Sequence, residues 1–118
     1  MTVPQQSAEF LARPVDAVAG LLPDRRSAEA AIAALRAAGF RPVEARPRHP
    51  GHCRLRDWGG DTTIMNLYVE GLHKGHSPVI VPSPWDRREQ VGRLLVRNQG
   101  HAVYYFTADG VESLTVLV

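Results

Sequence analysis

Residues 15–40, VDAVAGLLPDRRSAEAAIAALRAAGF, contain a short apolar run, a turn and an alanine-rich segment, and this order decides the fold. The apolar run from Val15 to Leu22 ends at Pro23 and Asp24, a combination that marks the end of a strand and the start of a turn. The alanine-rich segment favours a helix, because alanine has the highest helix propensity. We therefore predict a β-strand followed by an α-helix.

The predicted helix is amphipathic and has a start and a stop signal. Its apolar positions recur at helical spacing on one face: Ala28, Ala31, Ile32 and Leu35. Asp24 or Ser27 caps the start, since either side-chain oxygen accepts a hydrogen bond from an unpaired backbone N–H. Gly39 ends the helix, because glycine adopts the left-handed conformation at little cost.

The next segment, residues 40–60, is rich in proline and arginine, and it predicts only short strands. Val43–Ala45 has the length of one such strand. A second is predicted around residues 53–57, where Cys53 and Leu55 alternate with arginines. The sequence HPGH between the two strands predicts a turn.

Two further helices and two further strands are predicted downstream. Asp61 caps a helix over residues 61–75, which Gly75 ends, and residues 78–81, PVIV, form a buried central strand. Residues 83–86, SPWD, open a third helix with Ser83 at its N-cap, and Gly100 ends that helix. Residues 101–106, HAVYYF, are rich in β-branched and aromatic side chains and predict a strand. The tail, residues 114–118, either adds an edge strand or packs across the core.

The predicted order is β-α-β, then a helix, then β-α-β. This order indicates the α+β class, and specifically a ferredoxin-like split βαβ sandwich with an inserted middle helix and with its helices on one face of the sheet. We expect residues 1–13 to form a flexible leader and residues 14–118 to form a single α+β domain.

Composition excludes several classes of protein. The chain has 118 residues and a formal charge of +2, which is too small an excess for a dedicated nucleic-acid binder. Five arginines between residues 41 and 56 are better explained as a solvated edge. No apolar run is long enough to cross a bilayer, so we expect no membrane as partner. Because the positive charge is small, we also expect no nucleic acid as partner. A single cysteine, Cys53, excludes an internal disulfide and fits the cytoplasm.

Two stretches carry a family resemblance. Residues 18–40, VAGLLPDRRSAEAAIAALRAAGF, and residues 68–106, YVEGLHKGHSPVIVPSPWDRREQVGRLLVRNQGHAVYYF, resemble bacterial general-stress-protein-like small domains. The resemblance rests on caps, turns and apolar faces, and it implies the ferredoxin-like fold and a stress-associated role without assigned catalytic residues. Residues 46–60, RPRHPGHCRLRDWGG, replace the glycine- and alanine-rich apolar segment expected there.

The histidines allow a metal site. His49, His52 and Cys53 lie close together in the sequence, and His73 and His76 form a second pair. Imidazole and thiolate are ligands that zinc prefers, although zinc modules usually contain more cysteines. The alternative, which we favour, places His49 and His52 on a turn and His73 and His76 at a helix end, where positive charge suits the helix dipole.

A second hypothesis is a small cofactor-free enzyme, such as an isomerase, cyclase or lyase. In this hypothesis His73 or His76 acts as the acid or base, and Tyr68 or Asp61 orients the substrate. The structural alternative for Tyr68 is a core residue with its hydroxyl at the surface.

The leading hypothesis is a non-catalytic small-molecule-binding or regulatory domain. Trp58, Tyr68 and Trp85 would line a pocket for a small apolar or aromatic ligand between the sheet and the helices. Either tryptophan would otherwise plug an end of the core. We expect no cofactor, and we expect the chain to form a homodimer through its sheet.

Overall fold

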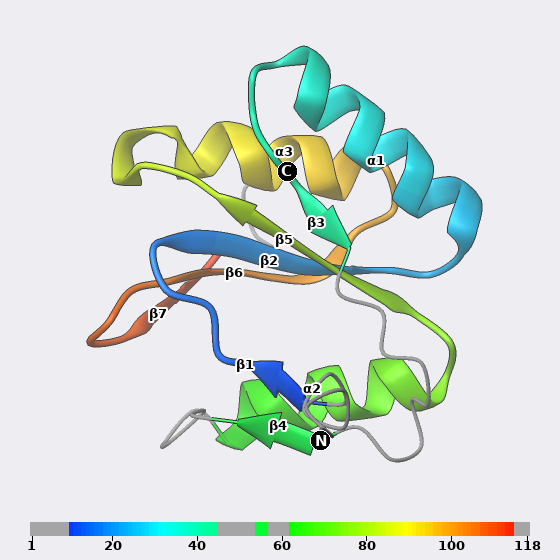
Figure 1. The fold of residues 1–118 in the computed structure, drawn as a ribbon, viewed down its shortest axis with the longest axis vertical. Helices are drawn as coiled ribbons and strands as arrows, with labels where there is room; N and C mark the ends of the chain where they lie inside the picture. Colours follow the sequence, from blue (N-terminus) through cyan, green and yellow to red (C-terminus); the bar gives the residue numbers. More distant parts are fainter. Residues whose placement is uncertain (1–9, 45–53, 57–61, 115–118) are drawn as a thin grey trace, which may run out of the picture.

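The computed structural model describes residues 10–44, 54–56 and 62–114 (Figure 1). In this part of the chain the elements are β1 (Phe10–Ala12), β2 (Ala17–Leu22), α1 (Arg25–Ala37), β3 (Val43–Glu44), β4 (Arg54–Arg56), α2 (Thr62–His73), β5 (Ser77–Pro82), the 3₁₀ turn η3 (Trp85–Arg87), α3 (Arg88–Arg97), β6 (His101–Phe106) and β7 (Val111–Ser113).

The main sheet has five strands in the order β3-β5-β2-β6-β7, and each neighbouring pair is antiparallel. The units β2-α1-β3 and β5-α3-β6 each enclose one strand of the other unit, an arrangement compatible with the ferredoxin-like split βαβ topology. Helix α2 lies between β3 and β5 in the chain, where the middle helix was expected. The prediction of the α+β class is confirmed.

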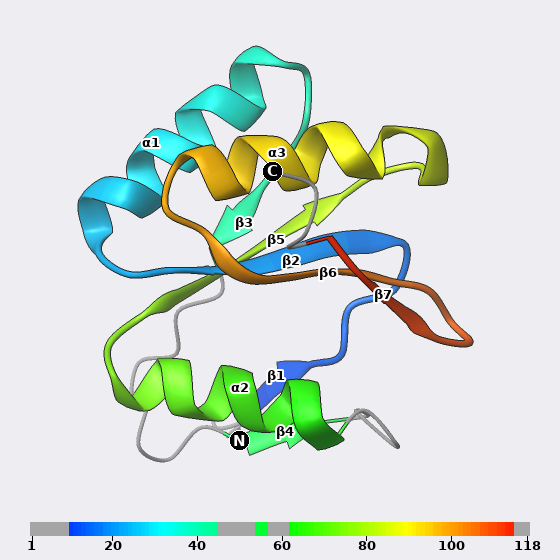
Figure 2. The ribbon, with the colours of Figure 1, turned by 180° about the vertical axis from the view of Figure 1, so that it is seen from behind.

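Helices cover both faces of this sheet. Helices α1 and α3 lie on one face, and α2 lies on the other together with a small parallel sheet of β1 and β4 (Figures 1 and 2). The prediction that all helices share one face is therefore wrong for α2. The reason is that β2 is apolar on both faces, and all six of its residues are buried.

Alternate side chains of the strands divide the core into two clusters. The first lies under α1 and α3 and contains Val18, Leu22, Ala28, Ala31, Leu35, Phe40, Val79, Val81, Val91, Leu95, Val103, Tyr105 and Leu114. The second lies under α2 and contains Ala19, Leu21, Tyr68, Leu72 and Phe106. Neighbours along β2 enter opposite clusters, as the two-residue period of a strand requires.

Several helix ends match the sequence signals. The backbone N–H of Ser27 donates to Asp24 Oδ1 at 2.8 Å, so Asp24 rather than Ser27 caps α1. This hydrogen bond lowers the pKa of the Asp24 carboxyl, since it favours the ionised form. Gly39 and Gly75 have φ angles of 95° and 84°, as expected for the residues that follow α1 and α2.

The third helix differs from its prediction at both ends. Ser83 does not cap it, because the Ser83 hydroxyl donates to the carbonyl of Pro84 at 2.9 Å and a 3₁₀ turn precedes α3. After α3 the left-handed residue is Gln99, with a φ of 77°. Gly100 is needed for a different reason, since a Cβ there would lie 2.6 Å from the carbonyl oxygen of Leu95.

Two predictions about chain organisation change. Residues 10–12, placed in the leader, form β1, which pairs with β4. Strands β3 and β4 were expected on either side of a turn, yet β3 pairs with β5 and β4 pairs with β1, so they belong to different sheets. The edge strand β7 precedes the predicted tail, and Leu114 directly after β7 is buried in the first cluster.

Substituting Gln99 tests the left-handed residue after α3. Q99G is expected to raise the free energy of unfolding by about 0.5–1 kcal/mol, because glycine adopts a positive φ without steric cost. Q99A is the matched control, since it removes the same side chain and keeps the Cβ. Chemical denaturation of both variants measures the effect, and equal stabilities would contradict it.

Candidate functional site

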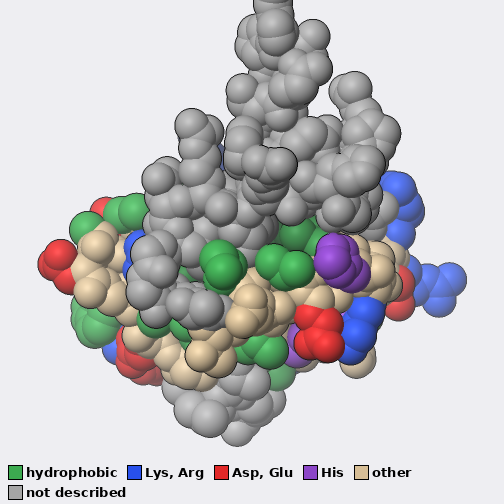
Figure 3. Space-filling model, turned by 90° about the horizontal axis from the view of Figure 1, so that it is seen from below, with side chains coloured by type: hydrophobic (Ala, Val, Ile, Leu, Met, Phe, Trp, Pro, Cys, Tyr) green, Lys and Arg blue, Asp and Glu red, His purple; other side chains and the backbone are tan. Residues whose placement is uncertain are grey.

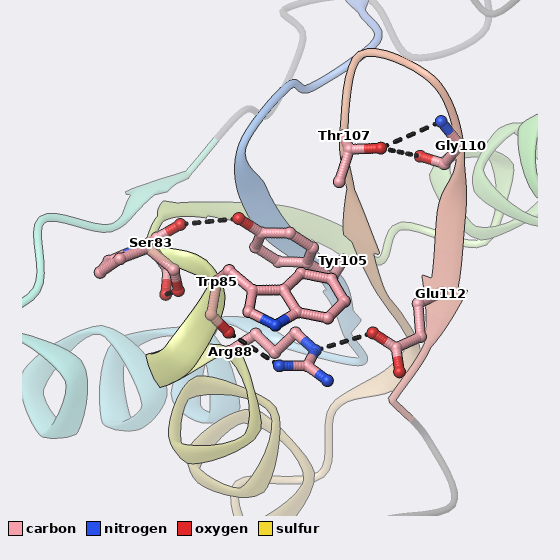
Figure 4. Close-up of polar contacts among 8 residues, drawn as sticks. Ser83, Trp85, Arg88, Tyr105, Thr107, Gly110 and Glu112 are labelled. Carbon is pink, nitrogen blue, oxygen red and sulfur yellow. Dashed lines mark hydrogen bonds and ion pairs between the residues drawn. The ribbon is translucent and has the colours of Figure 1, made fainter.

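A pocket of about 270 Å³ lies between the start of α3 and the β6–β7 hairpin (Figure 4). Its lining combines aromatic, acidic and small residues: Trp85, Tyr105, Thr107, Asp109, Gly110, Val111 and Glu112. These residues come from η3, the end of β6, the hairpin turn and β7. The pocket is therefore built where two segments about twenty residues apart in the sequence meet.

Trp85 forms one wall of this pocket and is held in place although it is exposed. The residue is 55% exposed, which is unusual for a large aromatic residue. Its ring meets that of Tyr105 edge to face, with centroids 5.6 Å apart and an interplanar angle of 76°. The guanidinium carbon of Arg88 lies 3.6 Å from the centroid of the indole, a cation–π contact (Figure 4).

Arg88 connects Trp85 to the opposite strand. Its Nε donates to Glu112 Oε1 at 2.7 Å, and its Nη1 donates to the carbonyl of Trp85 at 2.9 Å. The Arg88 side chain is only 15% exposed. A guanidinium with so little solvent needs these partners, and together they fix α3 against β7.

Tyr105 closes the inner end of the pocket. The Tyr105 hydroxyl donates to the carbonyl of Ser83 at 3.0 Å, which ties β6 to the segment before η3. Burial raises the pKa of Tyr105, and the charge of Asp16 raises it further. The hydroxyl is therefore protonated at neutral pH and acts as a hydrogen-bond donor.

The hairpin wall is braced from inside and outside. Within the turn, Thr107 Oγ1 accepts from the backbone N–H of Gly110 at 3.0 Å and donates to its carbonyl at 3.2 Å. From outside, the Arg13 guanidinium donates to the carbonyls of Thr107 and Gly110 at 2.8 and 3.0 Å. Among the residues that the structure describes, the exposed Asp109 carboxylate has no ion-pair partner, so it adds negative charge to the pocket.

Replacing Arg88 tests whether it braces this wall. R88M keeps much of the aliphatic stem but removes the contacts with Glu112 and the indole, and we expect it to lower the free energy of unfolding by about 1–2 kcal/mol. R93M is the matched control, since Arg93 forms an exposed 3.8 Å pair with Glu89 on the same helix, and such pairs contribute about 0–1 kcal/mol. Denaturation curves measure both, and equal losses would contradict the bracing role.

A second, smaller pocket of about 100 Å³ lies on the α2 side of the sheet. It contains two histidines from different parts of the chain. His76 Nδ1 and His101 Nε2 are 3.1 Å apart, and the ring planes meet at 86°. Glu70 and Lys74 of the α2 end line the same pocket. In the view from below, histidine, acidic and basic side chains gather at one side of this face (Figure 3).

Local backbone features position the two histidines. His76 directly follows Gly75, whose positive φ turns the chain from α2 into β5. His101 opens β6 next to a β-bulge, where Ala102 and Val103 together oppose Gly20 and Ala102 has a φ of 52°. The bulge is held from the second cluster, because the Tyr68 hydroxyl donates to the carbonyl of Ala102 at 2.9 Å.

Burial shifts the pKa values of two groups near this pocket, His101 and Tyr68. It lowers the pKa of His101, and the nearby His76 and Lys74 lower it further, while a hydrogen bond to the Gln99 backbone partly opposes them. Burial also raises the pKa of Tyr68 well above its usual value. Tyr68 is thus a neutral hydroxyl already bonded to a carbonyl, and its observed role is to support the bulge.

The lowered pKa of His101 predicts a loss of stability in acid. The unfolded chain binds a proton at His101 more readily than the folded chain, so the free energy of unfolding falls as the pH decreases below the ordinary histidine pKa of 6.5. Above that pH His101 contributes nothing to the dependence of the free energy of unfolding on pH. Denaturation at several pH values should show a shallower acid slope for H101Q. An unchanged slope in H101Q would contradict the assignment.

The structure separates residues that the sequence analysis grouped. Tyr68 lies in the cluster under α2, whereas Trp85 packs on Tyr105 of the other cluster, so the two do not line one pocket. His73 is exposed and lines neither pocket described above, while His76 meets His101. The remaining candidates lie outside the described residues: Asp61, Trp58, His49, His52 and Cys53.

Sequence reasoning missed His101, Arg88 and Glu112. A signal for His101 was present, since a Gly-His pair precedes or opens each of the two strands β5 and β6. Both strands run antiparallel to β2, so their starts lie at the same end of the sheet, with Leu22 opposite Ser77 and Leu21 opposite His101. The contact between Arg88 and Glu112 has no such signal, because it depends on the path of the hairpin.

Comparisons with protein-family models, with curated proteins and with solved structures found no match for this chain. The resemblance to general-stress-protein-like domains therefore remains a prediction. Within the described ranges, no helix has the length and apolar character needed to cross a membrane.

Proposed function

We propose that this chain is a small-molecule-binding domain without catalytic activity, and that it binds a planar, positively charged ligand in the pocket beside Trp85. The observation that carries the proposal is an exposed indole fixed by Arg88 and Tyr105 at the mouth of a cavity. A rigid aromatic wall lowers the entropic cost of binding a flat ligand, because the wall needs little ordering when the ligand arrives.

The volume limits the ligand to a small molecule. At about 270 Å³ the pocket is close to the lower end of the range for small-molecule sites, which is about 300–1,000 Å³. A compound with one or two rings fits this volume. A nucleotide or a large cofactor does not.

The charge of the lining favours a cation. Asp109 contributes a carboxylate with no ion-pair partner among the described residues, whereas the carboxylate of Glu112 is already paired with the guanidinium of Arg88, which also contacts the Trp85 ring. A positively charged group in the pocket therefore meets carboxylate oxygens and the face or edge of aromatic rings. An anionic ligand would approach Asp109 at an electrostatic cost.

The hydroxyls in the pocket support binding rather than catalysis. The Tyr105 hydroxyl donates a hydrogen bond to the carbonyl of Ser83, and the Thr107 hydroxyl is hydrogen-bonded within the hairpin turn. In the enzyme hypothesis Tyr68 orients the substrate, whereas in the structure the Tyr68 hydroxyl donates to the carbonyl of Ala102. A homodimer is also part of our proposal, with the exposed edge strand β7 as the surface available for pairing. A stress-associated role in a bacterial cytoplasm is proposed from the resemblance alone.

Titration with three flat probes of equal size tests the ligand class. Benzamidine is a cation, benzamide is neutral and benzoate is an anion. In a W58F background the one remaining indole N–H signal reports Trp85. We expect it to shift saturably in the order benzamidine, benzamide, benzoate, with dissociation constants on the order of millimolar for probes so small. Small linear shifts of equal size for all three would contradict a built site.

Two substitutions test separately the contributions of charge and of the aromatic wall to ligand binding in this pocket. D109N should reduce the preference for benzamidine over benzamide by about two- to fivefold, which is the range of an exposed charge pair. D86N is the matched control, because Asp86 is exposed beside Trp85 but does not line the pocket. W85A should abolish the benzamidine-induced shift of the Gly110 backbone amide. Retention of that shift would place the ligand elsewhere.

A further inference from the structure

We propose that His76 and His101 form a binding site for a divalent transition-metal ion, with solvent completing its coordination. The site lies under α2, on the opposite face of the sheet from the core cluster that contains Tyr105 of the Trp85 pocket. This proposal is independent of the ligand proposed for that pocket. It also differs from the sequence hypothesis of a site at His49, His52 and Cys53.

The distance between the two ring nitrogens fits one shared metal ion. His76 Nδ1 and His101 Nε2 are 3.1 Å apart. Two imidazole nitrogens bound to one ion at about 2.05 Å, with an angle of about 90–109° between the bonds, lie about 2.9–3.4 Å apart. The two histidines thus already hold the separation of a pair of ligands.

The orientation of the rings agrees with ligation. The centroids are 4.9 Å apart and the planes meet at 86°, so the contact is made by nitrogen atoms and not by stacked ring faces. Without a metal, one of the facing nitrogens must carry the proton that joins the pair. With a metal, both facing nitrogens present lone pairs, and the protons sit on His76 Nε2 and His101 Nδ1. For two neutral rings, binding moves a proton within one ring by way of solvent and releases none.

The surroundings of the pair are partly shielded from solvent and carry little net charge. His76 and His101 are both half-buried. The other charged groups at this pocket are Glu70 and Lys74, which pair with each other at 3.9 Å and are both exposed. Lys74 disfavours an incoming cation and Glu70 favours it, so the pair leaves the local charge nearly balanced.

The site is open and has two protein ligands. Within the described residues there is no group of three or more His, Cys, Asp or Glu side chains placed to hold a metal ion. Affinity is therefore lower than at a structural zinc site with four protein ligands. Imidazole favours Cu²⁺, Ni²⁺ and Zn²⁺, with Cu²⁺ bound most tightly, whereas Mg²⁺ prefers oxygen ligands.

The fold holds both ligands in place before a metal binds. Gly75 and the bulge at Ala102 fix the backbone next to each histidine, and Tyr68 supports the bulge by its hydrogen bond. Ala102 has a φ of 52°, which lies in the left-handed region where a residue with a Cβ is strained. Such strained positions are common where a bulge directs a side chain into a site.

Metal titration of the full chain tests the proposal. An H49Q/H52Q/C53S background removes the donors predicted at residues 49–53, and calorimetry with Cu²⁺, Ni²⁺, Zn²⁺ and Mg²⁺ measures binding. We expect one Cu²⁺ per chain, weaker binding of Ni²⁺ and Zn²⁺, and none of Mg²⁺. The electron paramagnetic resonance spectrum of the Cu²⁺ form should show coupling to two nitrogen ligands.

Single substitutions assign the ligands. H76Q and H101Q should each weaken Cu²⁺ binding at least tenfold and remove the coupling to the second nitrogen. H73Q is the matched control and should change neither, because His73 lies three residues before His76 and outside this pocket. Circular dichroism confirms folding of each variant, and H76Q decides the matter if H101Q does not fold.

Three outcomes would overturn the proposal. One is the absence of saturable Cu²⁺ binding in the background variant. A second is an affinity that H73Q lowers as much as H76Q does. A third is a ratio of one ion to two chains, which would show that one chain does not form the site. Benzamidine binding should be unaffected by H76Q. A negative result for the metal site would therefore not count against the ligand proposed for the Trp85 pocket.

Discussion

The structure depends on one constraint, which is that strand β2 is apolar on both faces and both faces must be covered. All six residues from Ala17 to Leu22 are buried. Val18 and Leu22 pack under α1 and α3, whereas Ala19 and Leu21 pack under α2. A strand of this kind cannot lie at an edge or face solvent on one side, so it pairs with β5 and β6 and requires a helical layer above and below.

Strand β6, which pairs with β2, contributes a residue to each of the two candidate sites. Its residues alternate between the two clusters, with Val103 and Tyr105 facing α3 and Phe106 facing α2. The bulge at Ala102 adds one residue opposite Gly20 and so shifts the alternation at the start of the strand. His101 therefore meets His76 at one end of β6, and Tyr105 supports Trp85 near the other. Both sites are positioned by a strand whose place is set by β2.

Local signals in the sequence were sufficient to predict most helices and strands, but not which of these elements contact one another. Helix α1 was predictable because its cap at Asp24 and its end at Gly39 depend only on neighbouring residues. The side of the sheet that α2 covers was not predictable from the sequence. An amphipathic pattern shows that a helix has a buried face, but it does not show which surface that face packs against. The pairing of β1 with β4 and the ion pair of Arg88 with Glu112 join distant segments, and residue type alone does not select such partners.

The exposure of Trp85 is the feature on which the proposed ligand site depends. A tryptophan that plugged the end of the core would be buried, yet Trp85 is 55% exposed, whereas its neighbour Tyr105 is buried in the first cluster. Holding the indole there requires Arg88 to give up most of its hydration, a cost that its bonds to Glu112 and the Trp85 carbonyl offset. An exposed ring that served only stability would gain more by folding against the core, where burial contributes about 25 cal/mol per Å². The arrangement instead keeps an aromatic surface fixed and accessible, as the proposed binding of a flat ligand requires.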